Sequence, residues 1–287
     1  MILSEAILLV KKRLKDIYQE DEINAIAMLL CQHFFGINKV SYHTSKQSTL
    51  VDSAIPSFFT ALDKLQQHCP IQYVLGESSF YGYTLKVNES VLIPRPETEE
   101  LVDWICKDYK DYKYQINVLD IGTGSGAIAI SLAKELPFAH VTAVDISATA
   151  LSIAQANAHL NNATINFQKE DIFSPSAMLA QERFDLIVSN PPYVRESEKE
   201  LMNPNVLNYE PDSALFVTDS NPLKYYEAIA NFASQHLAQN GAIYLEINEA
   251  LGLQAVALFS KEKYITTLRK DINGKDRMLK AMRIQNG

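Results

Sequence analysis

The sequence has few cysteines, and their arrangement suggests neither a disulfide nor a metal site. Cys31, Cys69 and Cys106 are its three cysteines, they are far apart, and no Cys-x-x-Cys pair is present. The six histidines form no cluster with the spacing of metal ligands. Small buried thiols in a reducing compartment are the ordinary explanation for such cysteines. We therefore expect no metal and no disulfide.

Long apolar runs are also missing. No stretch approaches the roughly 18 apolar residues needed to span a bilayer. The first apolar stretch has no basic residues ahead of it, because Lys11, Lys12 and Arg13 follow it. These features do not fit a secretory leader or a membrane anchor. We expect a cytoplasmic protein that does not associate with membranes.

Basic residues are outnumbered by acidic ones. The 287 residues include 26 Lys and Arg against 34 Asp and Glu, a formal net charge of −8. A protein that wraps a long stretch of nucleic acid needs clustered basic residues to displace counterions. This balance argues against such a role, although a local basic patch remains compatible with it. With 47% hydrophobic residues, the composition is typical of a globular protein with one large domain or two modest ones.

The hydrophobic pattern divides the chain into three parts. Apolar residues recur at helical spacing around 6–17, 23–34 and 58–68, which predicts a small helical bundle. The stretch 80–87 has the pattern of a strand with a turn. We expect a helical domain over 1–72, a β-hairpin linker over 73–93 and a larger domain over 94–287.

Strands and helices alternate in this larger domain, which is typical of a doubly wound, mostly parallel sheet. The pair Asn273-Gly274 between the last two strands predicts an antiparallel turn that closes the sheet. Between Ser189 and Pro222 about thirty residues show little periodicity, and loops beyond about 15 residues are usually functional or disordered. The seven expected strands are 116–121, 141–145, 164–168, 184–188, 242–247, 264–270 and 277–283, and the expected helices begin at Pro96, Ala127, Thr149, Pro222 and Ala250.

A glycine-rich turn follows the first strand of this sheet. Glycines there let the backbone turn sharply and approach a ligand closely. Asp145, at the end of the next strand, can accept hydrogen bonds from both hydroxyls of a ribose. The candidate cofactor-binding residues of the turn are Asp120, Gly122, Thr123, Gly124, Ser125 and Gly126.

Two cofactors fit this turn. The spacing Gly122-x-Gly124-x-x-Ala127 also satisfies the looser dinucleotide fingerprint, so an NAD-dependent dehydrogenase remains an alternative. We favour S-adenosylmethionine because a negative charge at Asp120 is unfavourable beside a pyrophosphate and favourable near an amino group or a sulfonium. After the third strand, Phe173 could stack on an adenine and Asp171 could accept from its amine. A loop aromatic that fills core is the other explanation for Phe173.

The run Asn190-Pro191-Pro192-Tyr193 follows the fourth strand. The lone pair of an amide or aromatic amine nitrogen is delocalised, so its methylation requires acceptors that hold both hydrogens of the NH2 group. The side-chain carbonyl of Asn190 and the backbone carbonyl of Pro191 can be those acceptors. The two prolines keep the oxygens aimed, and Tyr193 could stack on the flat acceptor group. The pattern predicts methyl transfer to a planar nitrogen, as catalysed by amide and adenine methyltransferases.

Three further blocks give the chain a close resemblance to the peptide chain release factor N5-glutamine methyltransferases, the PrmC/HemK family. The blocks are Pro70–Glu77, Leu92–Glu99 and Tyr209-Glu210-Pro211. The resemblance implies a helical N-terminal domain, a linking hairpin and a Rossmann-like class I methyltransferase domain. It also implies methylation of the glutamine in the Gly-Gly-Gln motif of class 1 release factors.

By matching positions, the resemblance also assigns roles within the site. It implies that S-adenosylmethionine, with S-adenosylhomocysteine as its product, is bound by Gly122–Gly126, Asp145, Phe173 and Asn190. It implies that Asn190–Tyr193 hold the glutamine and that Arg95 shapes the substrate channel. We expect a monomer that does not bind nucleic acid. The alternatives are a DNA or RNA adenine-N6 methyltransferase, and a non-catalytic binding module that keeps the fold.

Overall fold

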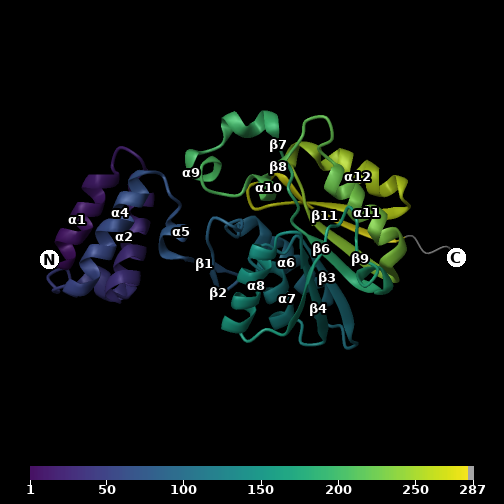
Figure 1. The fold of residues 1–287 in the computed structure, drawn as a ribbon, viewed down its shortest axis with the longest axis horizontal. Helices are drawn as coiled ribbons and strands as arrows, with labels where there is room; N and C mark the ends of the chain where they lie inside the picture. The colour runs from purple at the N-terminus through teal and green to yellow at the C-terminus, as the bar shows by residue number, and fades with distance from the viewer. Residues whose placement is uncertain (284–287) are drawn as a thin grey trace. The chain divides into compact units, whose positions relative to one another are not determined.

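Residues 1–283 are described by the computed structural model, in which the chain forms two units (Figure 1). The first contains Met1–Glu77 together with Asn203–Tyr209, and the second contains Ser78–Met202 and residues 210–283. Each unit has a hydrophobic core of its own. Among residues 1–283, no helix combines the length and the apolar character needed to cross a membrane.

The first unit is a helical bundle. The apolar residues of its first helix, such as Leu3, Ala6, Val10 and Leu14, are spaced three and four apart and are fully buried. The three helices expected from periodicity are present as α1, α2 and α4, whereas α3 and α5 are too short to produce a periodic signal. The helices are α1 (Leu3–Leu14), α2 (Glu20–Phe35), α3 (Lys39–Thr44), α4 (Ile55–Gln66) and α5 (Ile71–Leu75), with η1 (Asp52–Ala54) and, from the later segment, α9 (Pro204–Leu207).

The second unit is built on a seven-stranded sheet with the order β10-β11-β9-β6-β3-β4-β5. Only β11 runs against its neighbours, so the expected mostly parallel sheet with an antiparallel closing strand is confirmed. The strands are β3 (Ile116–Ile121), β4 (Ala139–Asp145), β5 (Ile165–Lys169), β6 (Phe184–Ser189), β9 (Leu237–Glu246), β10 (Tyr264–Lys270) and β11 (Asp276–Arg283). A separate hairpin pairs β1 (Glu77–Phe80) with β2 (Tyr83–Lys86).

Helices cover both faces of this sheet (Figure 1). The buried residues of α6, α7 and α8 share one core with β3 and β4, and those of α11 and α12 share another with β6 and β9. β6 is almost entirely buried because helices cover both faces of the sheet at this central strand. This burial explains why its sequence is mostly apolar. The helices are α6 (Pro96–Tyr109), α7 (Ala127–Glu135), α8 (Ala148–Leu160), α11 (Lys224–His236) and α12 (Gly252–Lys261), with η2 (Leu179–Gln181) and η4 (Glu249–Leu251).

The order of the strands positions a binding site. β3 lies between β4 and β6, so the chain first builds the sheet outward through β4 and β5 and then returns to the other side of β3. In doubly wound sheets, ligands bind beyond the carboxyl ends of the strands at such a reversal. The glycine-rich turn after β3 and the residues after β4 and β6 all lie there.

The long stretch between β6 and α11 contains short elements rather than an open loop. Its strands β7 and β8 form a parallel pair, Val194 with Phe216 and Arg195 with Val217. Each element is too short for a hydrophobic period to show in the sequence. Besides α9 they are β7 (Val194–Arg195), η3 (Glu196–Leu201), α10 (Asp212–Leu215) and β8 (Phe216–Val217).

Candidate active site

A cavity of about 340 Å³ opens at the carboxyl ends of β3, β4 and β6. It lies wholly within the second unit. Most of the residues singled out in the sequence line it, and three of them, Asp120, Gly126 and Tyr193, do not. The predicted residues in its wall are Arg95, Gly122, Thr123, Gly124, Ser125, Asp145, Asp171, Phe173, Asn190, Pro191 and Pro192.

The Asp145 carboxylate ties the glycine-rich turn to the end of β4. One oxygen accepts a hydrogen bond from the backbone N–H of Gly124 at 2.9 Å, and the other accepts from Ser147 N–H at 2.9 Å. Burial raises the pKa of Asp145, and these backbone hydrogen bonds oppose that rise. A Cβ added to Gly122 or Gly124 would meet no atom within 4 Å, so the turn faces open space. The turn and the carboxylate therefore form a cradle that a ligand could fill.

Gly126 packs α7 against α8 instead of lining the cavity. It is the N-cap of α7, with a φ of +84° that side chains rarely adopt. A Cβ there would lie 3.1 Å from Ala154 Cβ and 3.2 Å from Ile130 Cδ1. This glycine is required by conformation and by close packing together.

Replacement of Gly126 by alanine is therefore expected to destabilise the protein by about 2–5 kcal/mol, combining a left-handed alanine with overpacking. Gly274 is the matched control, because its φ is +78° and a Cβ there has no neighbour within 4 Å. Gly274→Ala should lower stability by only about 1–2 kcal/mol. Urea unfolding of both variants measures the difference, and equal losses would contradict the packing role.

Asp120 lies beneath the turn and does not face the cavity. Its side chain is fully buried, and its Oδ2 accepts a hydrogen bond from Thr123 Oγ1 at 2.6 Å. The sequence led us to expect this charge at the mouth of the site, but β3 carries the side chain into the interior. Burial raises the pKa of Asp120 from 3.8 to about 7. In this arrangement its direct contact is with a residue of the turn.

The raised pKa of Asp120 makes a pH dependence testable. Between about pH 4 and about pH 7 the folded protein retains a proton that the unfolded chain has lost, so stability falls as the pH rises, by about 1.4 kcal/mol per unit. Asp120→Asn removes this contribution. The stability of the variant relative to wild type should therefore increase from about pH 4 to about pH 7 and then level off. Urea unfolding across this range measures it, and a pH-independent difference would contradict the assignment.

Two aromatic rings meet in the wall of the cavity. Phe173 is 52% exposed, so it does not fill core, and its ring centre lies 5.1 Å from that of Tyr225. Asp171 Oδ1 accepts a hydrogen bond from the backbone N–H of Phe173 at 2.9 Å. Tyr225, in the first turn of α11, also lines the cavity. The only sequence signal for Tyr225 was an aromatic residue at the start of a predicted helix.

Asn190 presents an unpaired oxygen at the cavity. Its Nδ2 donates to Thr98 Oγ1 at 3.1 Å, and no residue among 1–283 donates a hydrogen bond to its Oδ1. Pro191 and Pro192 continue the wall beside it. An acceptor held in this way can receive a hydrogen from a planar NH2 group.

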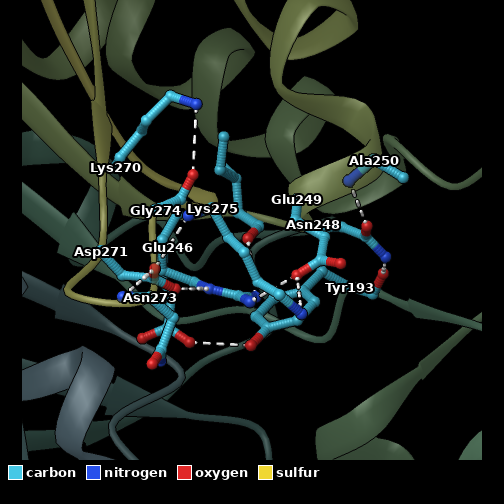
Figure 2. A network of polar contacts seen from close by, with 12 residues as sticks. Tyr193, Glu246, Asn248, Glu249, Ala250, Lys270, Asp271, Asn273, Gly274 and Lys275 are labelled. Atoms are coloured by element: carbon cyan, nitrogen blue, oxygen red, sulfur yellow. Dashed lines mark hydrogen bonds and ion pairs between the residues drawn. The ribbon is translucent and has the colours of Figure 1, made fainter.

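Tyr193 faces away from the cavity. Its hydroxyl donates to Glu246 Oε1 at 2.8 Å (Figure 2). The guanidinium carbon of Arg277 lies 5.9 Å from the centre of its ring. The expected stacking of Tyr193 on an acceptor group is not the arrangement seen here. Its ring instead packs, partly buried, against the hydrophobic core that α11 and α12 share with β6 and β9.

Arg95 lines the cavity and forms an ion pair with Glu210. Glu210 is only 4% exposed, and its other oxygen accepts from the backbone N–H of Ile93 at 3.2 Å. This pair joins two of the sequence blocks, Leu92–Glu99 and Tyr209-Glu210-Pro211. Pro211, next to Glu210, is also part of the cavity wall.

Thr98 and Glu246 are polar residues near the site that the sequence analysis did not single out. Thr98 lines the cavity from α6, and Glu246 is 1% exposed at the end of β9. The sequence feature that could have identified Glu246 is a carboxylate at the end of an otherwise apolar strand. None of the three cysteines forms a disulfide within the described residues, and residues 1–283 contain no group of three or more His, Cys, Asp or Glu side chains that could hold a metal.

Two known families match separate parts of the chain. The methyltransferase small domain family matches residues 101–209, and the PrmC N-terminal domain family matches residues 5–76. A release factor glutamine methyltransferase of Flavobacterium psychrophilum is 45% identical over 271 residues, which cover 93% of this chain and 94% of that protein. Another, of Bacteroides thetaiotaomicron, is 42% identical and covers 96% and 98%.

Solved structures support the fold. A methyltransferase from Pyrococcus furiosus superposes with a TM-score of 0.52 at 18% identity, covering 71% of this chain and 91% of its own. A 16S rRNA N2 G1207 methyltransferase from Thermus thermophilus, solved with AdoMet and guanosine, gives 0.51 at 19% identity and covers 72% and 50%. At these identities the likeness concerns the fold alone.

Proposed function

The chain belongs to the release factor glutamine methyltransferase family, and from that premise we propose the following reaction. The enzyme transfers a methyl group from S-adenosylmethionine to the side-chain amide nitrogen of the glutamine in the Gly-Gly-Gln motif of a class 1 release factor. The observation that carries this proposal is the unpaired Asn190 oxygen beside a cavity with a glycine-rich cradle. We further propose that the enzyme acts as a monomer in the cytoplasm and without nucleic acid.

The residues of the cradle fit S-adenosylmethionine. The Asp145 carboxylate keeps lone pairs beyond those used by Gly124 and Ser147, so it can accept both ribose hydroxyls. Open space beside Gly122 and Gly124 lets the backbone approach the ligand. The Phe173 and Tyr225 rings provide flat apolar surfaces that suit an adenine.

The acceptor side of the cavity suits a glutamine amide. Asn190 Oδ1 can accept one hydrogen of the substrate NH2 group, and the backbone carbonyl of Pro191 can accept the other. Holding both hydrogens orients the nitrogen lone pair and stabilises the positive charge that develops on nitrogen. Bringing the two reactants into line could supply on the order of 7–11 kcal/mol of the barrier.

The bond changes balance without a further catalyst. When bound, S-adenosylmethionine supplies an electrophilic methyl group, so the amide nitrogen gains an N–C bond while the C–S bond breaks and its electron pair stays on sulfur. The cationic nitrogen then loses a proton to solvent and becomes an N-methyl amide. A general base is not required, because this proton is strongly acidic. The residues of the site need only hold the two reactants, orient them and exclude water.

Incubation of the protein with labelled S-adenosylmethionine and a class 1 release factor tests the proposal. We expect label on the release factor, and mass spectrometry should place a single added methyl on the glutamine of the Gly-Gly-Gln motif. A release factor in which that glutamine is alanine is the matched control and should remain unlabelled. DNA and RNA run in parallel, and label on nucleic acid with none on the release factor would overturn the proposal.

A further inference from the structure

We propose that the buried Glu246 carboxylate sets the orientation of the Asn190 side-chain amide through the Thr98 hydroxyl. Glu246 would then be a positioning residue that never touches substrate. This inference rests on the proposed function, because the orientation matters only if Asn190 Oδ1 receives a hydrogen of the acceptor amide. It gives a role in the candidate site to one residue of α6 and one of β9.

The three side chains form a continuous line of hydrogen bonds. Asn190 Nδ2 donates to Thr98 Oγ1 at 3.1 Å, and Thr98 Oγ1 donates to Glu246 Oε2 at 2.6 Å. The other oxygen of Glu246 accepts from the Tyr193 hydroxyl at 2.8 Å, which Figure 2 shows. Glu246 is 1% exposed and Thr98 4% exposed, so solvent does not compete for the bond between these two side chains.

The direction of the line follows from the number of hydrogens. A carboxylate has none to give, so the single hydrogen of the Thr98 hydroxyl must be donated to Glu246. The Thr98 oxygen can then only accept from Asn190, and the only hydrogens on that side chain belong to its NH2 group. The NH2 group is thereby turned to Thr98, and Oδ1 is left to face the cavity.

The two prolines do not determine whether the oxygen or the nitrogen of the Asn190 amide faces the cavity. They restrict the backbone, but the terminal amide of Asn190 can still turn over about its last torsion angle, which exchanges the oxygen and the nitrogen. A reversed amide would present N–H groups to the substrate NH2, and two donors cannot form a hydrogen bond. A further interaction, besides the restricted backbone, is therefore required to fix the orientation of the amide.

The surroundings of Glu246 are mixed in charge. Burial raises its pKa, whereas the donors Thr98 and Tyr193 and the positive charge of Arg277, on β11, lower it. The carboxylate of Glu97, on α6, raises it again. Arg277 is itself held by Asp271, whose Oδ2 lies 3.2 Å from Nε. The two hydroxyl donors and Arg277 thus favour the ionised form of Glu246, which is the form that accepts from Thr98.

Two substitutions break the line while keeping the shapes of the side chains. Thr98→Val removes the hydroxyl, and Glu246→Gln supplies an NH2 group that can donate to Thr98. Each should lower kcat about 10- to 100-fold, the effect of one hydrogen bond to a charged group. The Kd for S-adenosylhomocysteine should stay unchanged, and the KM for release factor should change far less than kcat, since the contact of Asn190 with the acceptor amide is the one that is altered. Thr98→Ser keeps the hydroxyl and should restore most of the rate lost in Thr98→Val.

Tyr244→Phe is the control for a lost buried hydrogen bond. Its hydroxyl donates to Asp108 Oδ2 at 2.7 Å from the same strand as Glu246, away from the cavity wall. The inference is overturned if Thr98→Val or Glu246→Gln keeps the wild-type kcat, or if Thr98→Ser is as slow as Thr98→Val. A wild-type enzyme that fails to methylate release factor would overturn the proposed function as well. The comparison of Thr98→Val with Thr98→Ser tests the inference even if Glu246→Gln does not fold.

Discussion

Asn190→Ala is expected to lower kcat by about 10²–10³-fold, the usual effect of removing one preorganised group that stabilises charge in a transition state. The substitution deletes the oxygen proposed to receive a hydrogen of the substrate amide. It leaves the cradle around Asp145 untouched, so the Kd for S-adenosylhomocysteine should change far less than kcat. Single-turnover methylation of a release factor measures the first quantity, and calorimetric titration measures the second.

Asn117→Ala is the matched control. Asn117 is an asparagine of the same sheet, on β3 at the edge away from the cavity, where its Nδ2 donates to Arg183 O at 3.3 Å. Its loss should leave kcat unchanged. A wild-type rate for Asn190→Ala would refute the role of the side-chain oxygen, whatever the control shows. An Asn190→Ala enzyme that loses cofactor affinity and kcat to the same extent would assign this residue to cofactor binding alone.

Asp145→Ala is expected to weaken the binding of S-adenosylhomocysteine by about 10²–10⁴-fold. Two ribose hydroxyls bonded to a charged group are together worth about 3–6 kcal/mol. The substitution also removes the hydrogen bond that Gly124 N–H donates to Asp145 Oδ2 at 2.9 Å, so the glycine-rich turn is held less firmly. The two effects act in the same direction. Calorimetric titration with S-adenosylhomocysteine measures the combined loss.

Asp185→Ala provides the comparison. Asp185 Oδ2 also accepts from a backbone N–H, that of Asn117, at 2.8 Å, but at the opposite edge of the sheet. It should bind S-adenosylhomocysteine like wild type. If Asp145→Ala binds as tightly as Asp185→Ala, the proposed ribose contact is wrong. Tight binding of NADH by the wild-type protein would favour the dehydrogenase alternative instead.

The sheet could be predicted because its strands carry strong, simple patterns. Apolar runs such as Phe184–Ser189 are long enough to identify, and Asn273-Gly274 marks the turn between β10 and β11. The cradle and the tetrapeptide followed from the strand ends, since parallel strands bring their carboxyl ends to one edge. These features depend on local sequence and on one rule of topology.

The rest of the site depends on contacts across the sequence. Thr98 and Glu246 are 148 positions apart, and only the packing of α6 against the sheet brings their side chains together. The side of β3 on which Asp120 lies, and the partner of Tyr193, are likewise set by packing. A sequence pattern identifies residue types and strand ends, but it does not show which buried polar side chains will contact each other.

Residues Asn203–Tyr209 have a consequence for how the protein is made. They belong to the helical unit, where the Tyr209 hydroxyl donates to Gln67 O at 2.7 Å, although Met202 and Glu210 on either side belong to the sheet unit. A ribosome synthesises β3 through β6 before it reaches this segment. The helical unit therefore cannot be complete when its first 77 residues emerge. A fragment that ends there would lack a piece of its own bundle, so the two units cannot be separated by a single cut.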